Sequence, residues 1–226
     1  MVYGLEKFKN YFKGYEDQYV LIGGTACDIV FKNRDATFRN TRDLDMVLIV
    51  EALTPDFGKR FWELIKGGKY RNKVTNRGVP QFYRFDKPEV DNYPRMIELF
   101  CRENFELKEI KGITPIHIDD SISSLSAILL NEDYYRILLE GSVIEDGLSV
   151  LRPEYLILFK AKAYLDLLNR KNNGEKVDSN DISKHKKDTI LEKEPFDSNL
   201  LKVHSIKNEQ AIYLLKKPFA SLSMIK

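Results

Sequence analysis

The sequence contains few of the residues that cross-link small secreted proteins or build zinc sites. Its 226 residues include only 2 cysteines, Cys27 and Cys101. Each lies inside an apolar run and has no second ligand at the spacing of a zinc site. We therefore expect two buried thiols in a reducing cytosol, with a disulfide between them as the less favoured alternative.

Long apolar runs and a large net charge are also missing. No stretch approaches the roughly 18 apolar residues that cross a membrane, and the charged N-terminal segment has no apolar run of signal-peptide length. The 36 Lys and Arg residues nearly balance the 34 Asp and Glu residues, so the net charge of +2 does not indicate a nucleic-acid-binding protein. We expect a soluble, cytoplasmic protein with no membrane partner.

The hydrophobic content of 43% is enough for a sizeable core in one large domain or two small ones. Apolar residues at helical spacing predict an amphipathic helix over 3–16. Apolar and β-branched runs predict strands, and capping and breaking residues mark further helices. In chain order the prediction is strand 19–22, helix 26–33, strand 43–50, a helix from Pro55 to Gly67-Gly68, and strands 81–85 and 94–101.

The pattern changes near residue 151. Before it, three apolar segments at 124–130, 134–144 and 148–151 predict a β-meander. After it, Pro153 opens a helix that covers 155–170, and a charged helix follows at 181–193, with weaker helical material at 198–222. The sequence thus predicts an α/β (α+β) catalytic domain, residues 1–151, with a mixed sheet and flanking helices, followed by a helical C-terminal domain, residues 152–226.

Gly23-Gly24-Thr25 directly follows the strand predicted at 19–22. Two glycines at this point indicate positive φ or a close backbone approach, and Thr25 is a plausible N-cap for the next helix. Backbone N–H groups at a helix N-terminus bind phosphate. The turn is therefore a candidate site for the phosphates of a nucleotide.

Asp43 and Asp45 begin the strand predicted at 43–50. Because side chains alternate along a strand, both carboxylates point the same way. Close carboxylates repel unless a cation lies between them, and hard oxygen ligands suit Mg²⁺. Glu98, the lone charge in Met96-Ile97-Glu98-Leu99-Phe100, is the candidate third acid; the alternative is that Glu98 pairs with a buried arginine, such as Arg95 or Arg102. Together with the glycine turn, these acids suit nucleotidyl transfer.

Basic residues gather in one stretch despite the nearly neutral total. Residues 59–77 hold seven basic residues against one acid, Glu63. A solvated surface is the plain interpretation, and a track for an RNA backbone is the functional alternative.

The motifs Gly23-Gly24-Thr25, Thr41-Arg42-Asp43-Leu44-Asp45 and Ile97-Glu98-Leu99 resemble those of the polymerase-β-type nucleotidyltransferase superfamily. The residues of these motifs are most similar to those of the AbiEii-like group, which includes toxins of toxin–antitoxin systems. The resemblance spans roughly residues 19–190 and implies a nucleotidyltransferase-type mixed sheet. It also implies a triphosphate-binding lysine, matched by Lys160, although Lys162 competes for the role, and a late aspartate, matched by Asp181 or Asp188.

The resemblance implies two metal ions, Mg²⁺, bound by Asp43, Asp45 and Glu98, and an NTP such as ATP held at Gly23, Gly24, Thr25, Lys160 and Asp188. We expect transfer of an NMP from the NTP to an acceptor hydroxyl, which toxin-like relatives suggest is on tRNA or another RNA, and a cognate antitoxin is a candidate partner. The alternatives are a small-molecule acceptor, such as an antibiotic, and a nucleotide-binding module without catalysis. Seventeen residues separate Thr25 from Asp43, so the segment between them must be extended.

Overall fold

The computed structural model describes residues 2–32, 41, 43–74, 80–102, 113–116, 125–130 and 132–191. Within these ranges, the structure describes the backbone but not the side chains of residues 72–74, 80–82, 113–116, 125–130, 166, 181 and 187–191. Across the described ranges, no helix has the length and apolar character to span a membrane. The helical material predicted at 198–222 lies outside the described residues.

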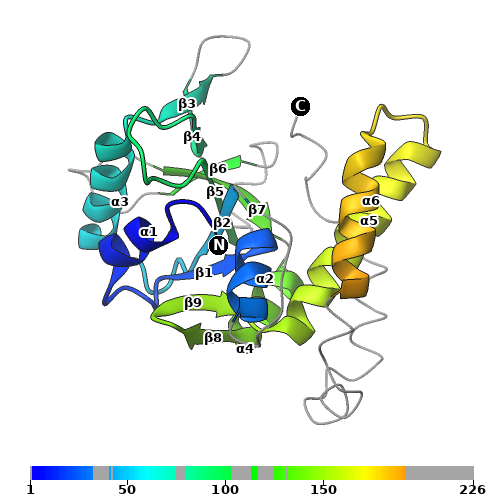
Figure 1. Cartoon of the computed structure of the whole chain (residues 1–226), viewed down its shortest axis with the longest axis horizontal. Helices are drawn as coiled ribbons and strands as arrows, with labels where there is room; N and C mark the ends of the chain where they lie inside the picture. Colours follow the sequence, from blue (N-terminus) through cyan, green and yellow to red (C-terminus); the bar gives the residue numbers. More distant parts are fainter. Residues whose placement is uncertain are drawn as a thin grey trace.

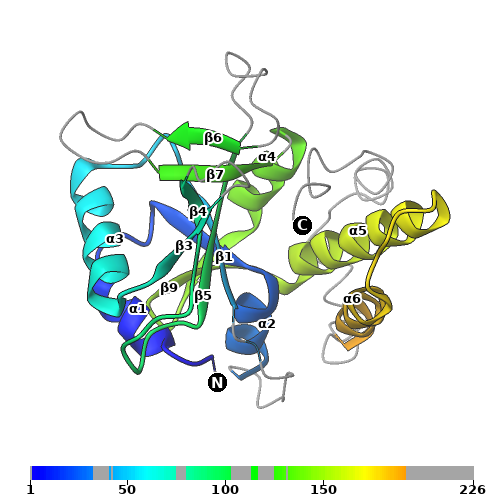
Figure 2. The same ribbon diagram turned by 90° about the horizontal axis from the view of Figure 1, so that it is seen from above.

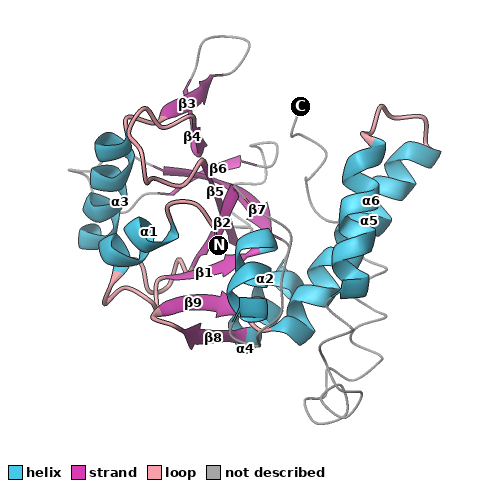
Figure 3. Cartoon of the chain, viewed as in Figure 1, coloured by secondary structure: helices cyan, strands magenta, loops and turns pink. Residues whose placement is uncertain are grey.

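A mixed nine-stranded sheet forms the centre of the fold (Figures 1 and 3). Its main path runs β3-β4-β5-β2-β1-β9-β8, and β7 pairs with both β5 and β6. The pairs β1/β9, β2/β5 and β5/β7 are parallel, and the others are antiparallel. The strands are β1 (Tyr19–Ile22), β2 (Asp43–Leu48), β3 (Arg71–Val74), β4 (Pro80–Asp86), β5 (Met96–Arg102), β6 (Ile113–Ile116), β7 (Leu125–Leu130), β8 (Ser142–Glu145) and β9 (Leu148–Leu151).

Helices cover both sides of this sheet. Figure 2 shows α1 and α3 on one side and α2, α4 and α5 on the other, with α6 packed along α5. The helices are α1 (Leu5–Phe12), α2 (Gly23–Lys32), α3 (Pro55–Gly68), α4 (Glu132–Gly141), α5 (Pro153–Asn172) and α6 (Ser179–Leu191). The predicted fold class, a mixed sheet with flanking helices followed by helical material, is confirmed. The division into two domains after residue 151 stays a prediction.

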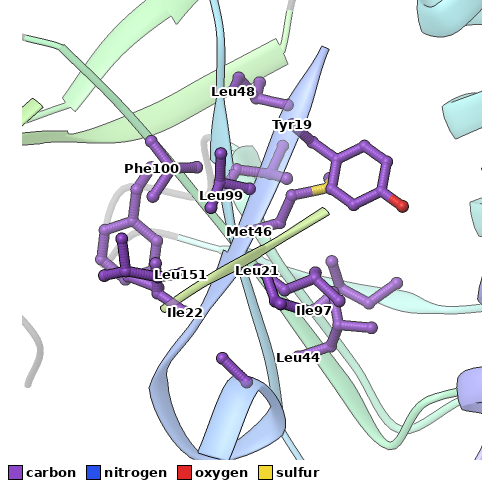
Figure 4. Close-up of a cluster of buried hydrophobic side chains, with 14 of the residues drawn as sticks. Tyr19, Leu21, Ile22, Leu44, Met46, Leu48, Ile97, Leu99, Phe100 and Leu151 are labelled. Atoms are coloured by element: carbon purple, nitrogen blue, oxygen red, sulfur yellow. The ribbon is translucent and has the colours of Figure 1, made fainter. Parts of the chain in front are cut away.

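The core lies where the central strands meet their covering helices. All four residues of β1 are buried, and the inward side chains of β2 and β5 pack beside them (Figure 4). On the α1/α3 side, Phe12 packs against the rings of Tyr19 and Phe57, with centroids 5.9 and 5.0 Å apart. Burial of such aromatic rings is among the largest single contributions to a core. The core thus fixes the central strands that carry the candidate acids.

The β-meander prediction is wrong in its middle segment. Residues 132–141 form α4, and only the end of the predicted strand becomes β8. Tyr134, Tyr135, Ile137 and Leu138 are buried on one helical face, a spacing equally consistent with a helix. The parallel pairing of β9 with β1 requires a connection that crosses over rather than a meander.

The structure also defines the turn before β9, the cap of α3 and the state of the two cysteines. Asp146 and Gly147 form the turn between β8 and β9, with φ of 49° and 68°. Thr54 caps α3 by accepting a hydrogen bond from the Phe57 N–H at 3.3 Å. Cys27 and Cys101 are both buried thiols, and the less favoured disulfide between them does not form. The strands β3 and β6 were not predicted.

Candidate functional site

The start of β2 brings two of the three candidate acids to the middle of the sheet. Asp43 and Asp45 are half-buried and flank Leu44, which is fully buried on the other face. Asp45 lies opposite Ile22 of β1 and opposite Glu98 of β5. Residues that oppose each other on adjacent strands point to the same face, so Asp43, Asp45 and Glu98 share one face of the sheet.

The glycine turn, Gly23-Gly24, lies directly against these acids at the first turn of α2. Gly23 has φ of 67°, as predicted for this turn. A β-carbon added to Gly23 would lie 2.0 Å from Asp45 Oδ2, and one added to Gly24 would lie 2.1 Å from Thr41 Oγ1. Both glycines are therefore needed for close approach, because any side chain would displace the Asp45 carboxylate or the Thr41 hydroxyl.

Thr25 has a different role from the predicted N-cap. α2 already begins at Gly23, so Thr25 lies inside the first turn. Its hydroxyl donates a hydrogen bond to the Asp43 carbonyl oxygen at 2.7 Å, and the residue is fully buried. Thr25 therefore ties α2 to the first residue of β2.

The surroundings of Asp45 strongly perturb its pKa. Burial and the negative charge of Glu98, with a smaller effect of Asp43, raise the pKa of Asp45 to about 7. The ammonium groups of Lys160 and Lys184 act in the opposite direction and lower this pKa. Three carboxylates and two lysines thus share one electrostatic environment.

Glu98 faces an arginine that was not among the predicted partners. Arg84 lies opposite Glu98 in the β4/β5 pairing, and its Nε and Nη2 both contact Glu98 Oε1. Arg102 instead pairs with Glu51 at 2.8 Å, and the Arg95 guanidinium stacks over the Tyr3 ring at 4.6 Å. A charged residue in the middle of each of two adjacent strands, Arg84 and Glu98, was the available signal, but it gave no register.

The donor set of this face can be compared with the needs of a metal ion. Among the described side chains, no three His, Cys, Asp or Glu residues form a group able to hold a metal. Asp43 and Asp45 still offer two carboxylates on one face. That set fits Mg²⁺, which usually takes one or two protein carboxylates and completes its shell with water and phosphate oxygens.

The helical half contributes cations to the same place. Lys160 and Lys162 of α5 are both buried, 4% and 3% exposed, and α5 packs against α2. Of these two lysines, Lys160 is the one whose charge lowers the Asp45 pKa. Lys184 of α6 does the same and was missed, because a lysine in a charged helix carries no distinguishing sequence signal.

Two further predictions concern surfaces and the late aspartate. Asp181 and Asp188 both belong to α6, but their side chains lie outside the described part of the structure. In the basic stretch 59–77, Lys59, Arg60 and Arg71 are exposed and each faces a nearby acid: Asp56, Glu63 and Glu89 respectively. These pairs reduce the local positive charge that an RNA backbone would meet.

Three comparisons with known proteins were made, and one of them found a similar structure. No family model matches the chain, and no curated protein matches its sequence. A solved structure of an antigenic nucleotidyltransferase-like protein from Paracoccidioides brasiliensis is similar over 99% of this chain and 98% of its own. The sequence identity is 13% and the TM-score is 0.39, a level of similarity that carries no argument about function.

Proposed function

We propose that the chain is a Mg²⁺-dependent nucleotidyltransferase that transfers an NMP from an NTP to an acceptor hydroxyl. The observation that carries this proposal is the convergence of Asp45, Glu98 and the glycine turn at the N-terminus of α2. A helix N-terminus favours phosphate, and adjacent carboxylates favour a divalent cation. One site therefore offers both of the groups that Mg²⁺-NTP requires.

Asp43 and Asp45 would hold Mg²⁺, which supplies charge neutralisation on the phosphates. The N-terminus of α2 at the glycine turn would face the phosphate chain, and Lys160 and Lys184, whose charges act on Asp45, would offset its negative charge. In the reaction the acceptor oxygen forms a bond to the α-phosphorus, the bond to pyrophosphate breaks, and the acceptor proton is released. Glu98 is the carboxylate next to Asp45 that could take this proton or join a second metal ion.

The acceptor in this proposal is an RNA 3′ hydroxyl, with tRNA as the first candidate. The support is the motif resemblance rather than a surface of this fold, because acids accompany Lys59, Arg60 and Arg71 of the basic stretch. A cognate antitoxin protein belongs to the same proposal. An acceptor on a small molecule is the alternative.

Transfer of label from each of the four α-labelled NTPs to total tRNA tests the proposal. We expect Mg²⁺-dependent labelling by the wild type and a loss of at least about 100-fold in Asp43→Asn and Asp45→Asn, because each variant removes a metal-binding charge. Full activity in either variant would refute the metal assignment. Calorimetric NTP binding without transfer to tRNA or small hydroxyl acceptors would instead indicate a binding module.

A further inference from the structure

We propose that Arg84 keeps Glu98 out of the metal site, so that Asp43 and Asp45 alone bind a single divalent cation. This inference rests on the proposed function and fixes the role of Glu98 in it, since Glu98 then joins no second metal ion. Arg84 is a positioning residue in this inference, because it acts through the Glu98 carboxylate rather than on the nucleotide.

The Arg84 guanidinium holds one oxygen of the Glu98 carboxylate from the side away from Asp45. Arg84 Nε and Nη2 both contact Glu98 Oε1, and the planar fork of a guanidinium fixes the position of an oxygen that it binds through two nitrogens. β5 lies between β4 and β2 in the sheet, so Arg84 and Asp45 flank Glu98 on opposite sides. Glu98 Oε1 is therefore held toward β4, whereas the two aspartates lie on β2.

A metal ion on this carboxylate oxygen would also meet the positive charge of Arg84. Mg²⁺ lies about 2.1 Å from a carboxylate oxygen and a guanidinium nitrogen about 2.8 Å, so an ion on Oε1 would lie within about 5 Å of the guanidinium. Positive charges at that distance repel each other, most strongly where little water screens them. The side chains of Arg84 and Glu98 are only 19% and 10% exposed, so the screening here is weak.

Asp43 and Asp45 have surroundings that suit a metal ion better. Asp45 Oδ2 lies against Gly23 at the N-terminus of α2, where the proposed function places phosphate oxygens. Mg²⁺ usually takes one or two protein carboxylates and completes its shell with water and phosphate. The two aspartates of β2 are therefore enough for one ion, without the carboxylate that Arg84 occupies.

Mn²⁺ binding identifies the ligands of the ion without any turnover. The paramagnetic resonance signal of free Mn²⁺ is followed at pH 8 with each protein alone and with the α,β-methylene analogues of the four NTPs in turn, which cannot release pyrophosphate. We expect a single Mn²⁺ per wild-type chain and at least about 100-fold weaker binding in Asp45→Asn, because a ligating charge is lost. Glu98→Gln should stay within about threefold of the wild type, because Arg84 already counters the Glu98 charge.

Removing the arginine should bring Glu98 into the metal site. We expect Arg84→Met to bind Mn²⁺ roughly 10-fold more tightly than the wild type, and Glu98→Gln to weaken binding at least about 10-fold in the Arg84→Met background. Equal effects of Glu98→Gln in the two backgrounds would show that Arg84 acts only as a distant charge, and would overturn the inference. The exposed pair of α3 supplies matched controls, since Arg60→Met and Glu63→Gln should leave the affinity unchanged.

The remaining outcomes are also decisive. A loss in Glu98→Gln as large as that in Asp45→Asn, or two Mn²⁺ per wild-type chain, would overturn the inference and leave a metal-dependent function standing. A wild-type protein that binds Mn²⁺ as expected but transfers no nucleotide would refute the proposed activity and leave the inference standing. A wild-type protein that binds no Mn²⁺ would overturn both. If Arg84→Met fails to fold, the comparison of Asp45→Asn with Glu98→Gln decides by itself.

Discussion

Asp45 is half-buried and has two neighbouring carboxylates, and both features oppose its ionisation. A carboxylate in such surroundings lowers the stability of the folded chain when no cation is bound. Its Oδ2 lies against Gly23, only 2.0 Å from the position that a β-carbon of residue 23 would take. Groups held at the expense of stability are typical of functional sites, which is why this residue is the most informative of the candidate acids.

Asp45→Asn should therefore make the metal-free protein more stable at alkaline pH. With a pKa of about 7 in the folded chain, against about 4 when unfolded, Asp45 takes up a proton on folding between these values. The unfolding free energy of the wild type consequently falls as pH rises from 4 to 7 and does not change further because of Asp45 above it. We expect Asp45→Asn to gain on the order of 2 kcal/mol at pH 8, measured by urea unfolding in EDTA.

The stability gain expected for Asp45→Asn is compared with that of a control variant and with measurements at lower pH. Asp56→Asn replaces an exposed acid of α3 and should leave the unfolding free energy nearly unchanged at pH 8. Near pH 4 the advantage of Asp45→Asn should disappear, because Asp45 is then protonated in the folded chain. Equal or lower stability of Asp45→Asn at pH 8 would show that the Asp45 charge is compensated in the folded protein.

At the scale of elements, the register of three strands aligns Arg84, Glu98 and Asp45. β4 places Arg84 opposite Glu98, and β5 places Glu98 opposite Asp45. The side chains of Arg84 and Glu98 are 19% and 10% exposed. In such surroundings an ion pair matters chiefly because each partner would be left buried if the other were lost.

Arg84→Met should destabilise the protein more than Glu98→Gln does. Arg84→Met removes the positive charge that faces Glu98, so the buried Glu98 carboxylate stays beside Asp45 without it. Glu98→Gln instead removes one of the two neighbouring negative charges, Glu98 and Asp45. We expect Arg84→Met to lower the unfolding free energy by roughly 2 kcal/mol and Glu98→Gln to lower it by less than about 1 kcal/mol, measured by urea unfolding at pH 8. Arg60→Met on the exposed surface of α3 is the matched control. The reverse order of the two losses would show that Glu98 does not depend on Arg84.

The same register explains which parts of the site were predictable. The glycine turn, Asp43 and Asp45 are short-range patterns, so period-two alternation and turn chemistry were enough. The Arg84–Glu98 pair and the close approach of Thr41 Oγ1 to Gly24 could not be predicted, because they depend on which strands pair and on how closely β2 approaches α2. A single sequence carries no direct information about such pairing.

The fold, too, has parts that the sequence predicts and parts that it does not. The hairpin β8/β9 follows from the Asp146-Gly147 turn, since both residues take positive φ as hairpin turns require. The segment that forms α4 was misassigned because aromatic and β-branched residues favour strands locally. Packing of its buried face on β5 and α5 decides in favour of the helix.

At the scale of the whole molecule, the acids and the cations of the site come from different parts of the fold. The sheet supplies Asp43, Asp45 and Glu98, whereas α5 and α6 supply Lys160 and Lys184. α5 packs against α2, and α6 packs along α5 (Figures 1 and 2). Nucleotide binding in the proposed function would therefore join the sheet to the helical half through charge.

Lys184→Gln tests this role of α6. The Lys184 charge acts on Asp45, so its removal should raise the KM for the NTP about 10-fold and change kcat less, as expected for a contact made before the transition state. Lys160→Gln should have a larger effect, because Lys160 is buried and acts more strongly on Asp45. Steady-state transfer assays at two salt concentrations measure both variants.

Lys186→Gln is the matched control, because Lys186 lies on the same helix but is exposed. Its charge is screened by solvent, so its KM should stay close to that of the wild type. If Lys184→Gln and Lys186→Gln raised KM equally, and added salt removed both effects, α6 would act only as a diffuse positive surface. A selective loss in Lys184→Gln that persists at high salt requires a specific contact, and the helical half would then be part of the nucleotide site.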